Sequence, residues 1–347
     1  MTLRPVPPAG DSAPNPAAGR APNRADGPSA RSYWANGPSA RKGAAEEPAG
    51  AGAEAGDTAG AADPRGAEPR SGVAPAVVLT IAGSDSGGGA GLQADLRTFG
   101  ACGVHGCVAV TAVTVQNSVG VSGIVEIPAG TVAAQIMAVA SDIGVRAAKT
   151  GMLASAAIIA AVARACRDAG IGQPDGVPFV VDPVAASMHG DQLLRDDALD
   201  ALRTELFPLA TVVTPNLDEV RLLVGIEVRD RAGQHAAARA LHELGPRWVL
   251  VKGGHLVDDP ECVDVLYNGL RFTELPAPRV DTPHTHGGGD TMASAITAAL
   301  ARGAPVPQAV AFAKRYVTEA VRHSYPLGAG VGPVGAPTGA AWEADAT

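Results

Sequence analysis

The stretch Ala76–Leu92, AVVLTIAGSDSGGGAGL, decides the fold class, because a β-branched apolar run passes through a glycine-rich turn into an apolar helix start. Such a turn lets backbone amides approach a ligand, and the helix N-terminus that follows favours negative charge. The turn is not a dinucleotide fingerprint, since Leu92 stands where the third glycine belongs, and it lacks the Gly-Lys-Ser/Thr of a Walker A loop. A ligand-facing turn and a tight structural turn both remain open.

The same alternation of apolar runs and amphipathic segments continues along the chain. The expected strands are 76–81, 108–113, 177–181, 211–214 and 248–251, and the expected helices are 92–100, 131–143, 154–169, 196–206, 232–244, 291–301 and 307–324. Continuous apolar strands that alternate with helices predict an α/β domain with a mostly parallel central sheet covered on both faces, in three α/β/α layers.

Composition excludes several classes of protein. Hydrophobic residues make up 46% of the 347 residues and aromatic residues 3%, so we expect an aliphatic core, while the net charge of −8 argues against a broad nucleic-acid-binding surface. The four cysteines form no Cys-x-x-Cys pair, which argues against a disulfide scaffold or a structural zinc site and favours a reducing compartment. No apolar run reaches the roughly 20 residues of a membrane span, and no signal peptide is recognisable, so we expect a cytoplasmic protein.

A change in amino-acid composition near residue 75 predicts the domain boundary. Residues 1–74 consist almost entirely of small, polar and charged residues, which bury too little apolar surface to offset ordering entropy, so we expect a disordered extension. Within it the pair Tyr33-Trp34 leaves open a docking segment for a partner. The folded domain is expected over 75–333, followed by a flexible tail over 334–347.

A second glycine cluster, Gly287-Gly288-Gly289-Asp290, opens the apolar helix expected from residue 291. Successive amides at a helix N-terminus form an anion pocket suited to a transferring phosphoryl group. Asp290 is either an ordinary acid favoured by the helix dipole or a base that accepts a proton from an attacking hydroxyl. His284 and His286 precede it in the loop, where loop or substrate contacts are favoured over metal binding.

Three other expected strands also end in polar residues. Asn216 and Glu219, three residues apart, would either orient a hydrated Mg²⁺ or form a plain helix cap. Lys252 would either balance nucleotide phosphates or stay a surface cation. Asp182 ends a further strand, and spacing alone assigns it no role.

Six segments in this order resemble the hydroxymethylpyrimidine/phosphomethylpyrimidine kinases, which belong to the ribokinase-like superfamily. The segments are 81–95 (IAGSDSGGGAGLQAD), 111–117 (TAVTVQN), 149–153 (KTGML), 181–184 (VDPV), 214–217 (TPNL) and 251–255 (VKGGH), and the resemblance spans residues 76–333. It implies a ribokinase-like domain that uses ATP to phosphorylate 4-amino-5-hydroxymethyl-2-methylpyrimidine and then its monophosphate, giving the pyrophosphate used in thiamine biosynthesis. It also implies a homodimer.

The resemblance also implies roles for particular residues. By resemblance, Gln116 recognises the pyrimidine, and Gly83, Asp95 and Met152 line the same pocket. The residues implied to bind ATP are Lys252, Asn216, Gly288 and Lys314, and Glu219 is implied to face Mg²⁺ through water. Asp290 is implied to be the catalytic base, with Gly287 and Gly289 in the anion hole.

One position departs from the resembling family, whose members usually read Gly-Thr-Gly-Cys where this chain reads Gly-Gly-Gly-Asp. An Asp at this place is what ribokinases and pyridoxal kinases use as base, and a carboxylate is ionised at pH 7 whereas a thiol is mostly not. Two alternatives therefore stand beside the pyrimidine kinase. One is a pyridoxal or pyridoxine kinase on the same fold, and the other is a catalytically silent pyrimidine-binding sensor.

Overall fold

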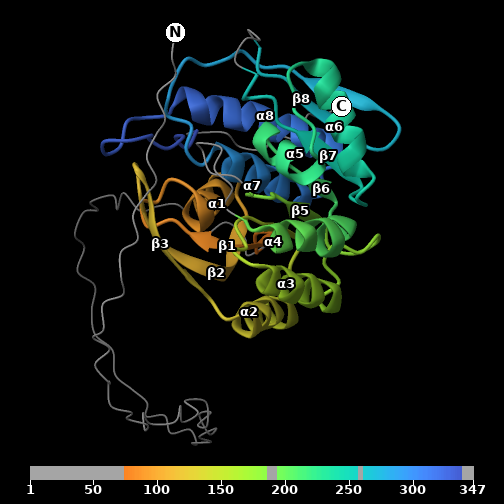
Figure 1. Ribbon diagram of the computed structural model, residues 1–347. Helices are drawn as coiled ribbons and strands as arrows, with labels where there is room; N and C mark the ends of the chain where they lie inside the picture. The colour runs from red at the N-terminus through yellow and green to blue at the C-terminus, as the bar shows by residue number, and fades with distance from the viewer. Residues whose placement is uncertain (1–73, 186–193, 257–260, 338–347) are drawn as a thin grey trace, which may run out of the picture. The chain divides into compact units, whose positions relative to one another are not determined.

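The computed structural model describes residues 74–185, 194–256 and 261–337, so the extension expected over 1–74 lies, but for its last residue, outside the described part. Most of the tail expected over 334–347 lies outside it as well. The described residues form one sheet in the order β3-β2-β1-β4-β5-β6-β7-β8-β9. Its strands are β1 (Val77–Ser84), β2 (His105–Asn117), β3 (Gly120–Glu126), β4 (Ala147–Thr150), β5 (Phe179–Val181), β6 (Val212–Val213), β7 (Trp248–Val251), β8 (Asp264–Tyr267) and β9 (Phe272–Leu275) (Figure 1).

Strands β2, β1, β4, β5, β6 and β7 pair in parallel, which confirms the mostly parallel sheet. The strands at the two margins pair antiparallel: β3 forms a hairpin with β2, β8 pairs with β7, and β9 pairs with β8. These marginal strands and β4 were not among the expected strands. Strand β4 has only four residues and contains Lys149, so its apolar signal is weak.

The helices are α1 (Gly91–Ala101), α2 (Ala129–Asp142), α3 (Ala156–Asp168), α4 (Asp196–Ala201), α5 (Leu217–Val224), α6 (Arg231–His242), α7 (Gly288–Ala301) and α8 (Val306–Arg322). The helix expected over 196–206 changes to a π-helical turn at Leu202–Leu206. Helix α5 was not among the expected helices, although a helix cap by Asn216 and Glu219 was one of the two alternatives there.

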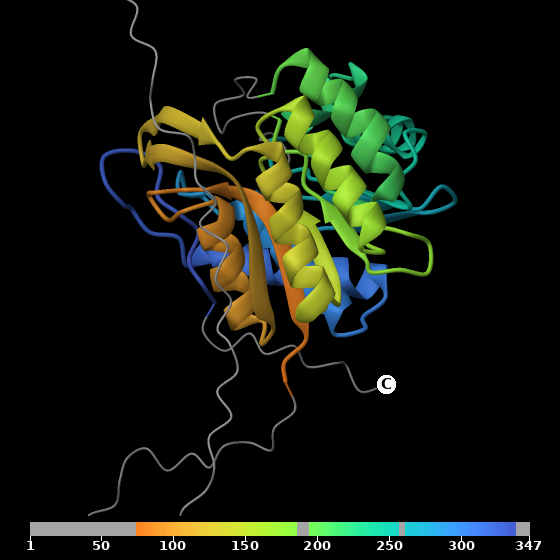
Figure 2. The same cartoon turned by 90° about the horizontal axis from the view of Figure 1, so that it is seen from below.

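Two aliphatic cores hold the three layers together. Side chains of α2 to α6 pack on one face of the sheet, and those of α1, α7 and α8 pack on the other. In Figure 2 the yellow and green helices cover one side of the sheet, while the orange and blue helices cover the other. Strand β1 lies between both layers, and its six central residues are buried, as its continuous apolar run predicts.

The four cysteines are free thiols, in agreement with the expectation from their spacing. Within the described ranges, no helix has the length and apolar character that a membrane crossing requires.

Candidate active site

The parallel strands bring their carboxyl ends to one edge of the sheet, where ligands bind in open α/β sheets. The segments that follow four of these ends carry polar residues of the site: Asp85 after β1, Asp182 after β5, Asn216 after β6 and Lys252 after β7. Helix α7 begins at the same edge, with Gly287 as its N-cap.

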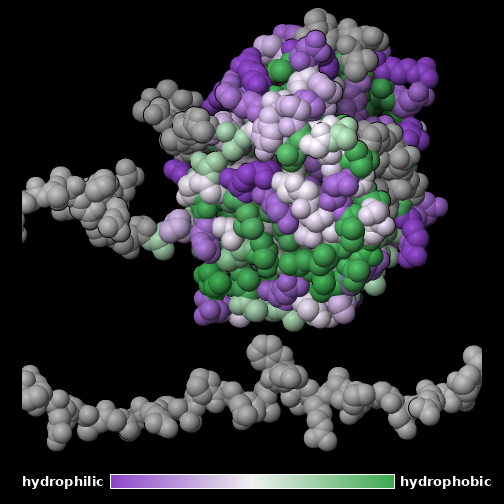
Figure 3. Space-filling view, turned by 90° about the vertical axis from the view of Figure 1, so that its left-hand side faces the viewer, coloured by the Kyte–Doolittle hydropathy of each residue, from purple (hydrophilic) through white to green (hydrophobic). Residues whose placement is uncertain are grey.

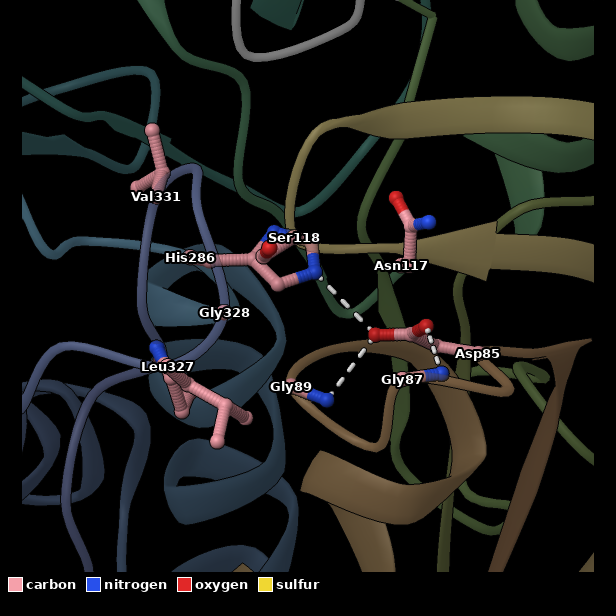
Figure 4. Close-up of a pocket in the computed structure, with 10 residues that line it drawn as sticks. Asp85, Gly87, Gly89, Asn117, Ser118, His286, Leu327, Gly328 and Val331 are labelled. Atoms are coloured by element: carbon pink, nitrogen blue, oxygen red, sulfur yellow. Dashed lines mark hydrogen bonds and ion pairs between the residues drawn. The ribbon is translucent and has the colours of Figure 1, made fainter.

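The glycine-rich turn after β1 folds around the carboxylate of Asp85. The backbone amides of Gly87, Gly89 and Ala90 donate to this carboxylate over 2.8–2.9 Å, and His286 Nε2 lies 3.0 Å from its Oδ2 (Figure 4). Burial alone would raise the pKa of Asp85, but the contacts with His286 and the amides outweigh it and hold that pKa below its usual value. The Asp85–His286 pair thus ties the first glycine turn to the loop that leads into α7.

Helix α7 needs glycine at its start. Gly287 has a φ of +78°, a left-handed conformation that side chains disfavour, and a Cβ there would collide with the carbonyl of Gly89. The turn after β1 and the N-terminus of α7 are therefore in direct backbone contact. The first amides of a helix lack intrahelical partners and carry the positive end of its dipole, so this terminus is suited to a phosphoryl group.

Asp290 lies in the first turn of α7, and its side chain is 17% exposed. Its Oδ1 is 3.7 Å from Lys149 Nζ, and its carboxylate accepts a hydrogen bond from the backbone N–H of Gly91. Burial raises the pKa of Asp290 to about 6, and the charge of Lys149 opposes the rise. The carboxylate is therefore mostly ionised at pH 7, with a proton affinity close to that of a good general base.

Lys149 and Asp95 form an ion pair inside the protein, and both side chains are 0% exposed. Lys149 Nζ donates to Asp95 Oδ1 over 2.7 Å, and the same carboxylate accepts from Thr80 Oγ1 and Ser294 Oγ over 2.6 Å each. Burial alone would lower the pKa of Lys149, but Asp95 and Asp290 outweigh it and raise that pKa, so the lysine stays protonated at neutral pH.

A second charged cluster joins Asp182, Lys252 and Glu219. Lys252 Nζ donates to Asp182 Oδ1 over 3.1 Å, and Thr214 Oγ1 donates to the same oxygen over 3.0 Å. A Cβ on Gly289 would lie 3.2 Å from Lys252 Nζ, so the absence of a side chain lets the lysine approach the first turn of α7.

Asn216 and Glu219 form a reciprocal cap at the start of α5. Asn216 Oδ1 accepts from Glu219 N over 2.9 Å, and Glu219 Oε2 accepts from Asn216 N over 2.8 Å. The cap that the spacing left open is thus present, yet Glu219 is also 3% exposed and interacts with Lys252. Burial raises the pKa of Glu219 to about 7, and the charge of Lys252 opposes the rise.

The residues expected to recognise the pyrimidine are partly brought together. A Cβ on Gly83 would lie 2.5 Å from Met152 Cε, and Gln116 Nε2 is 3.4 Å from His286 Nε2. Asp95, by contrast, lies beneath this group, because its carboxylate is fully buried among Thr80, Lys149 and Ser294.

A pocket of about 300 Å³ opens beside these residues. Its walls come from the glycine turn, the β2–β3 hairpin, the α7 approach loop and a C-terminal segment: Asp85, Gly87, Gly89, Asn117, Ser118, His286, Leu327, Gly328, Val331 and Pro333 (Figure 4). The C-terminal segment is attached on both sides, since Val331 N donates to Ser118 O and Val334 N donates to His286 O over 3.0 Å each.

Lys314, expected near the nucleotide, is 6% exposed and pairs with Asp264 at the start of β8, with Nζ to Oδ2 at 2.8 Å. The other oxygen of Asp264 accepts from Gly253 N over 2.8 Å. Lys314 therefore supports the turn that carries Lys252.

Sequence reasoning missed three features. Lys149 was quoted within a motif but received no role, Asp182 was left unassigned, and the Asp85–His286 pair joins residues far apart in the chain. The sequence around Lys149 gave little signal, because the strand that contains it reads Ala-Ala-Lys-Thr and its burial depends on the sheet.

Together these residues suit phosphoryl transfer: a base with a pKa near 6, a cation beside it and a helix N-terminus directed at the same place. Within the described ranges, no group of three or more His, Cys, Asp or Glu side chains is placed to hold a metal ion.

Comparisons with known proteins agree with this chemistry. The hydroxymethylpyrimidine/phosphomethylpyrimidine kinase of Mycobacterium leprae is 61% identical over 77% of this chain and 95% of that protein. A bifunctional thiamine biosynthesis protein of Geobacter sulfurreducens is 48% identical over 74% of this chain and 51% of its own length. The ADP complex of Bacillus subtilis pyridoxal kinase superposes with a TM-score of 0.69 at 38% identity and covers 76% of this chain and 98% of that chain. The phosphomethylpyrimidine kinase family model matches residues 85–335, so the chain belongs to this family of kinases with the ribokinase-like fold.

Proposed function

We propose that this kinase transfers the γ-phosphoryl group of ATP to the hydroxymethyl oxygen of 4-amino-5-hydroxymethyl-2-methylpyrimidine, and in a second step to the phosphate of the product. The pyrophosphate so formed serves thiamine biosynthesis. The observation that carries the phosphoryl transfer is the position of Asp290, a partly buried carboxylate in the first turn of α7 that lies 3.7 Å from Lys149. The family to which the chain belongs supports the pyrimidine as acceptor.

In the first step, the hydroxyl oxygen forms a bond to the γ-phosphorus while the bond from that phosphorus to the bridging oxygen of ADP breaks. Asp290 accepts the hydroxyl proton, which its raised pKa favours. The first amides of α7 receive the negative charge that develops on the phosphoryl oxygens, and Lys252 places a positive charge beside Gly289. Because phosphoryl transfer depends on positioning and electrostatics, the glycines should matter as much as the base.

Glu219 suits a hydrated Mg²⁺ better than direct ligation. Both of its oxygens already accept a backbone N–H, one from Asn216 and one from Ala185, so the remaining lone pairs are available to a water of the ion. Mg²⁺ bound to the nucleotide supplies charge neutralisation on the phosphates. Asn216 orients Glu219 through the reciprocal cap.

For the pyrimidine, we assign Gln116, Gly83 and Met152 to the ring, since Gly83 contacts Met152 and Gln116 approaches His286. Asp95 would act from beneath the pocket through Lys149. Lys314 would act on the nucleotide through the turn at Lys252 that it supports.

The deciding experiment measures ATP turnover with Mg²⁺ on three acceptors at matched concentration: hydroxymethylpyrimidine, its monophosphate and pyridoxal. We expect turnover with both pyrimidines and little with pyridoxal, and a loss of about 10²–10⁴-fold in kcat for Asp290→Asn. Preference for pyridoxal would replace the proposal with the less supported pyridoxal kinase, to which the B. subtilis structure is similar. Tight pyrimidine binding without ATP turnover would identify a sensor.

We also propose that the kinase is a homodimer joined through the β2–β3 hairpin. Val115, Val121 and Val125 are 48–64% exposed, and Figure 3 shows apolar side chains gathered on the side of the molecule where this hairpin lies. Val113 pairs with Val125 in the register, so these side chains share one face of an edge that a second copy would cover.

Light scattering tests the homodimer. We expect about twice the chain mass for the wild type, the chain mass for Val125→Lys, and an unchanged dimer for Leu270→Lys, a control at an 87% exposed position on the opposite margin of the sheet. A monomeric wild-type protein would refute the proposal.

A further inference from the structure

We propose that Lys149, held in place by Asp95, is a positioning residue that sets the ionisation and the orientation of the side chain at position 290. This inference rests on the proposed function only in that residue 290 accepts the substrate proton. It assigns a role to two buried residues that do not themselves reach the reacting atoms.

The geometry fixes Lys149 from one side and leaves its other side to Asp290. Asp95 holds its Nζ at 2.7 Å, and Asp95 is itself held by hydroxyl donors from Thr80 on β1 and Ser294 on α7. Asp290 Oδ1 lies at 3.7 Å from the same Nζ. A lysine with four rotatable bonds is thus confined by a carboxylate that three elements of the fold, β1, α1 and α7, keep in place.

Gly151, next after β4, lies beside both side chains, and a Cβ there would crowd Ala82 Cβ at 3.0 Å. A Cβ built there would lie 3.7 Å from both Lys149 Nζ and Asp290 Oδ1. The ammonium and the carboxylate therefore meet over a backbone without a side chain, at the carboxyl edge of the sheet.

Stability alone does not account for this pair. A buried ion pair costs desolvation that its own attraction barely repays, and well-packed apolar residues often do as well or better. The two hydroxyls beside the pair, those of Thr80 and Ser294, both donate to Asp95 and so fix the carboxylate that holds Lys149. An apolar residue in place of Lys149 would leave Asp290 without the positive charge that lies 3.7 Å from its carboxylate.

The charges that face Asp290 come from four elements. Lys149 on β4 favours its ionised form, while Asp95 on α1 and Asp182 after β5 oppose it. Lys252 after β7 also interacts with Asp290, at the far side of Gly289. Lys149 and Asp95 thus act with opposite signs, which gives the proposal a direction for each variant.

The experiment places a thiol at position 290 as a probe that needs no turnover. In Asp290→Cys, the rate of alkylation by iodoacetamide against pH gives the pKa of that thiol, and peptide mass spectrometry separates it from the four native cysteines. The titration is repeated with Lys149→Met and with Asp95→Asn. Lys314→Met serves as the matched control, because it removes another buried lysine that pairs with an aspartate.

We expect Lys149→Met to raise the thiol pKa by about one unit or more, the usual effect of losing an opposite charge at this distance. Asp95→Asn, which keeps the size and the hydroxyl partners, should lower it, and Lys314→Met should leave it unchanged. In the enzyme with Asp290, the acid limb of the kcat/KM profile should move in the same two directions.

If the thiol pKa shifts in the same direction in both variants, or does not shift, the proposal is overturned. A merely structural role does not predict that the two variants shift this pKa in opposite directions. If Lys149→Met does not fold, Asp95→Asn decides by itself: a fall supports the proposal, and a rise or no change refutes it. The alkylation result does not depend on catalysis, so a protein that fails to phosphorylate any acceptor would refute the proposed function and leave this test intact.

Discussion

Replacing Asp290 by Asn should abolish most activity and at the same time stabilise the ligand-free protein at alkaline pH. Burial raises the pKa of Asp290 from 3.8 to about 6, so the folded protein binds more protons than the unfolded chain between these values. The stability that protonated Asp290 contributes therefore falls as pH rises through this window, and this contribution is fully lost above it. About two pKa units at 1.36 kcal/mol each correspond to about 3 kcal/mol of unfolding free energy at pH 8.

Asparagine removes this cost because it carries no charge, and its Oδ1 still accepts from Gly91. At pH 5 Asp290 of the wild type is already mostly protonated, so part of this destabilisation is absent. The difference in unfolding free energy between the variant and the wild type should therefore be smaller at pH 5 than at pH 8 by about 1 kcal/mol. Loss of the base should lower kcat by about 10²–10⁴-fold with little change in KM.

Urea unfolding without nucleotide at pH 5 and pH 8 measures the first effect, and ATP turnover measures the second. The wild-type acid limb gives a third check: kcat/KM should fall about tenfold from its plateau at one pH unit below the pKa of about 6. If Asp290→Asn is destabilised equally at both pH values, the pKa of Asp290 is not raised by burial as we infer. If Asp290→Asn turns over at the wild-type rate, Asp290 is not the base of the reaction.

Three further substitutions test the rest of the site. Lys252→Met leaves the buried Asp182 unpaired and should lower kcat by about a hundredfold while raising KM for ATP in steady-state kinetics; unchanged constants would exclude Lys252 from the transfer step. Gly83→Ala places a Cβ 2.5 Å from Met152 Cε, so KM for the pyrimidine should rise while KM for ATP stays constant; equal changes in both would contradict a pyrimidine site there. Glu219→Gln should raise the Mg²⁺ concentration for half-maximal rate by about tenfold or more, and an unaltered Mg²⁺ requirement would remove Glu219 from the ion.

The fold could be predicted where local signals are strong. The run before Gly83 and the apolar stretch Trp248–Val251 are buried on both faces, and continuous apolar composition predicts such strands. The margins could not be predicted in this way. Strand β3 is exposed along most of its length, so its apolar residues do not alternate with the period of a half-buried strand.

The candidate site could be predicted where it consists of a turn and the start of a helix. Gly287 to Asp290 stand at the N-terminus of α7, as the glycine cluster indicated, and Asn216 with Glu219 forms the cap that their spacing allowed. The same spacing does not reveal that Glu219 is buried beside Lys252, because burial depends on α5 packing against the sheet.

Long-range charge pairs are what local sequence cannot supply. Asp95 and Lys149 are 54 residues apart, and Asp182 and Lys252 are 70 apart, so each pair exists only because α1, β4, β5 and β7 meet at one edge. Each lysine alone is compatible with a surface cation, and each aspartate with a solvated acid. The parallel sheet order pairs each lysine with its own aspartate and brings both lysines close enough to interact with Asp290. The ionisation of Asp290 is therefore a property of the topology, and the opposite shifts expected for Lys149→Met and Asp95→Asn measure that property directly.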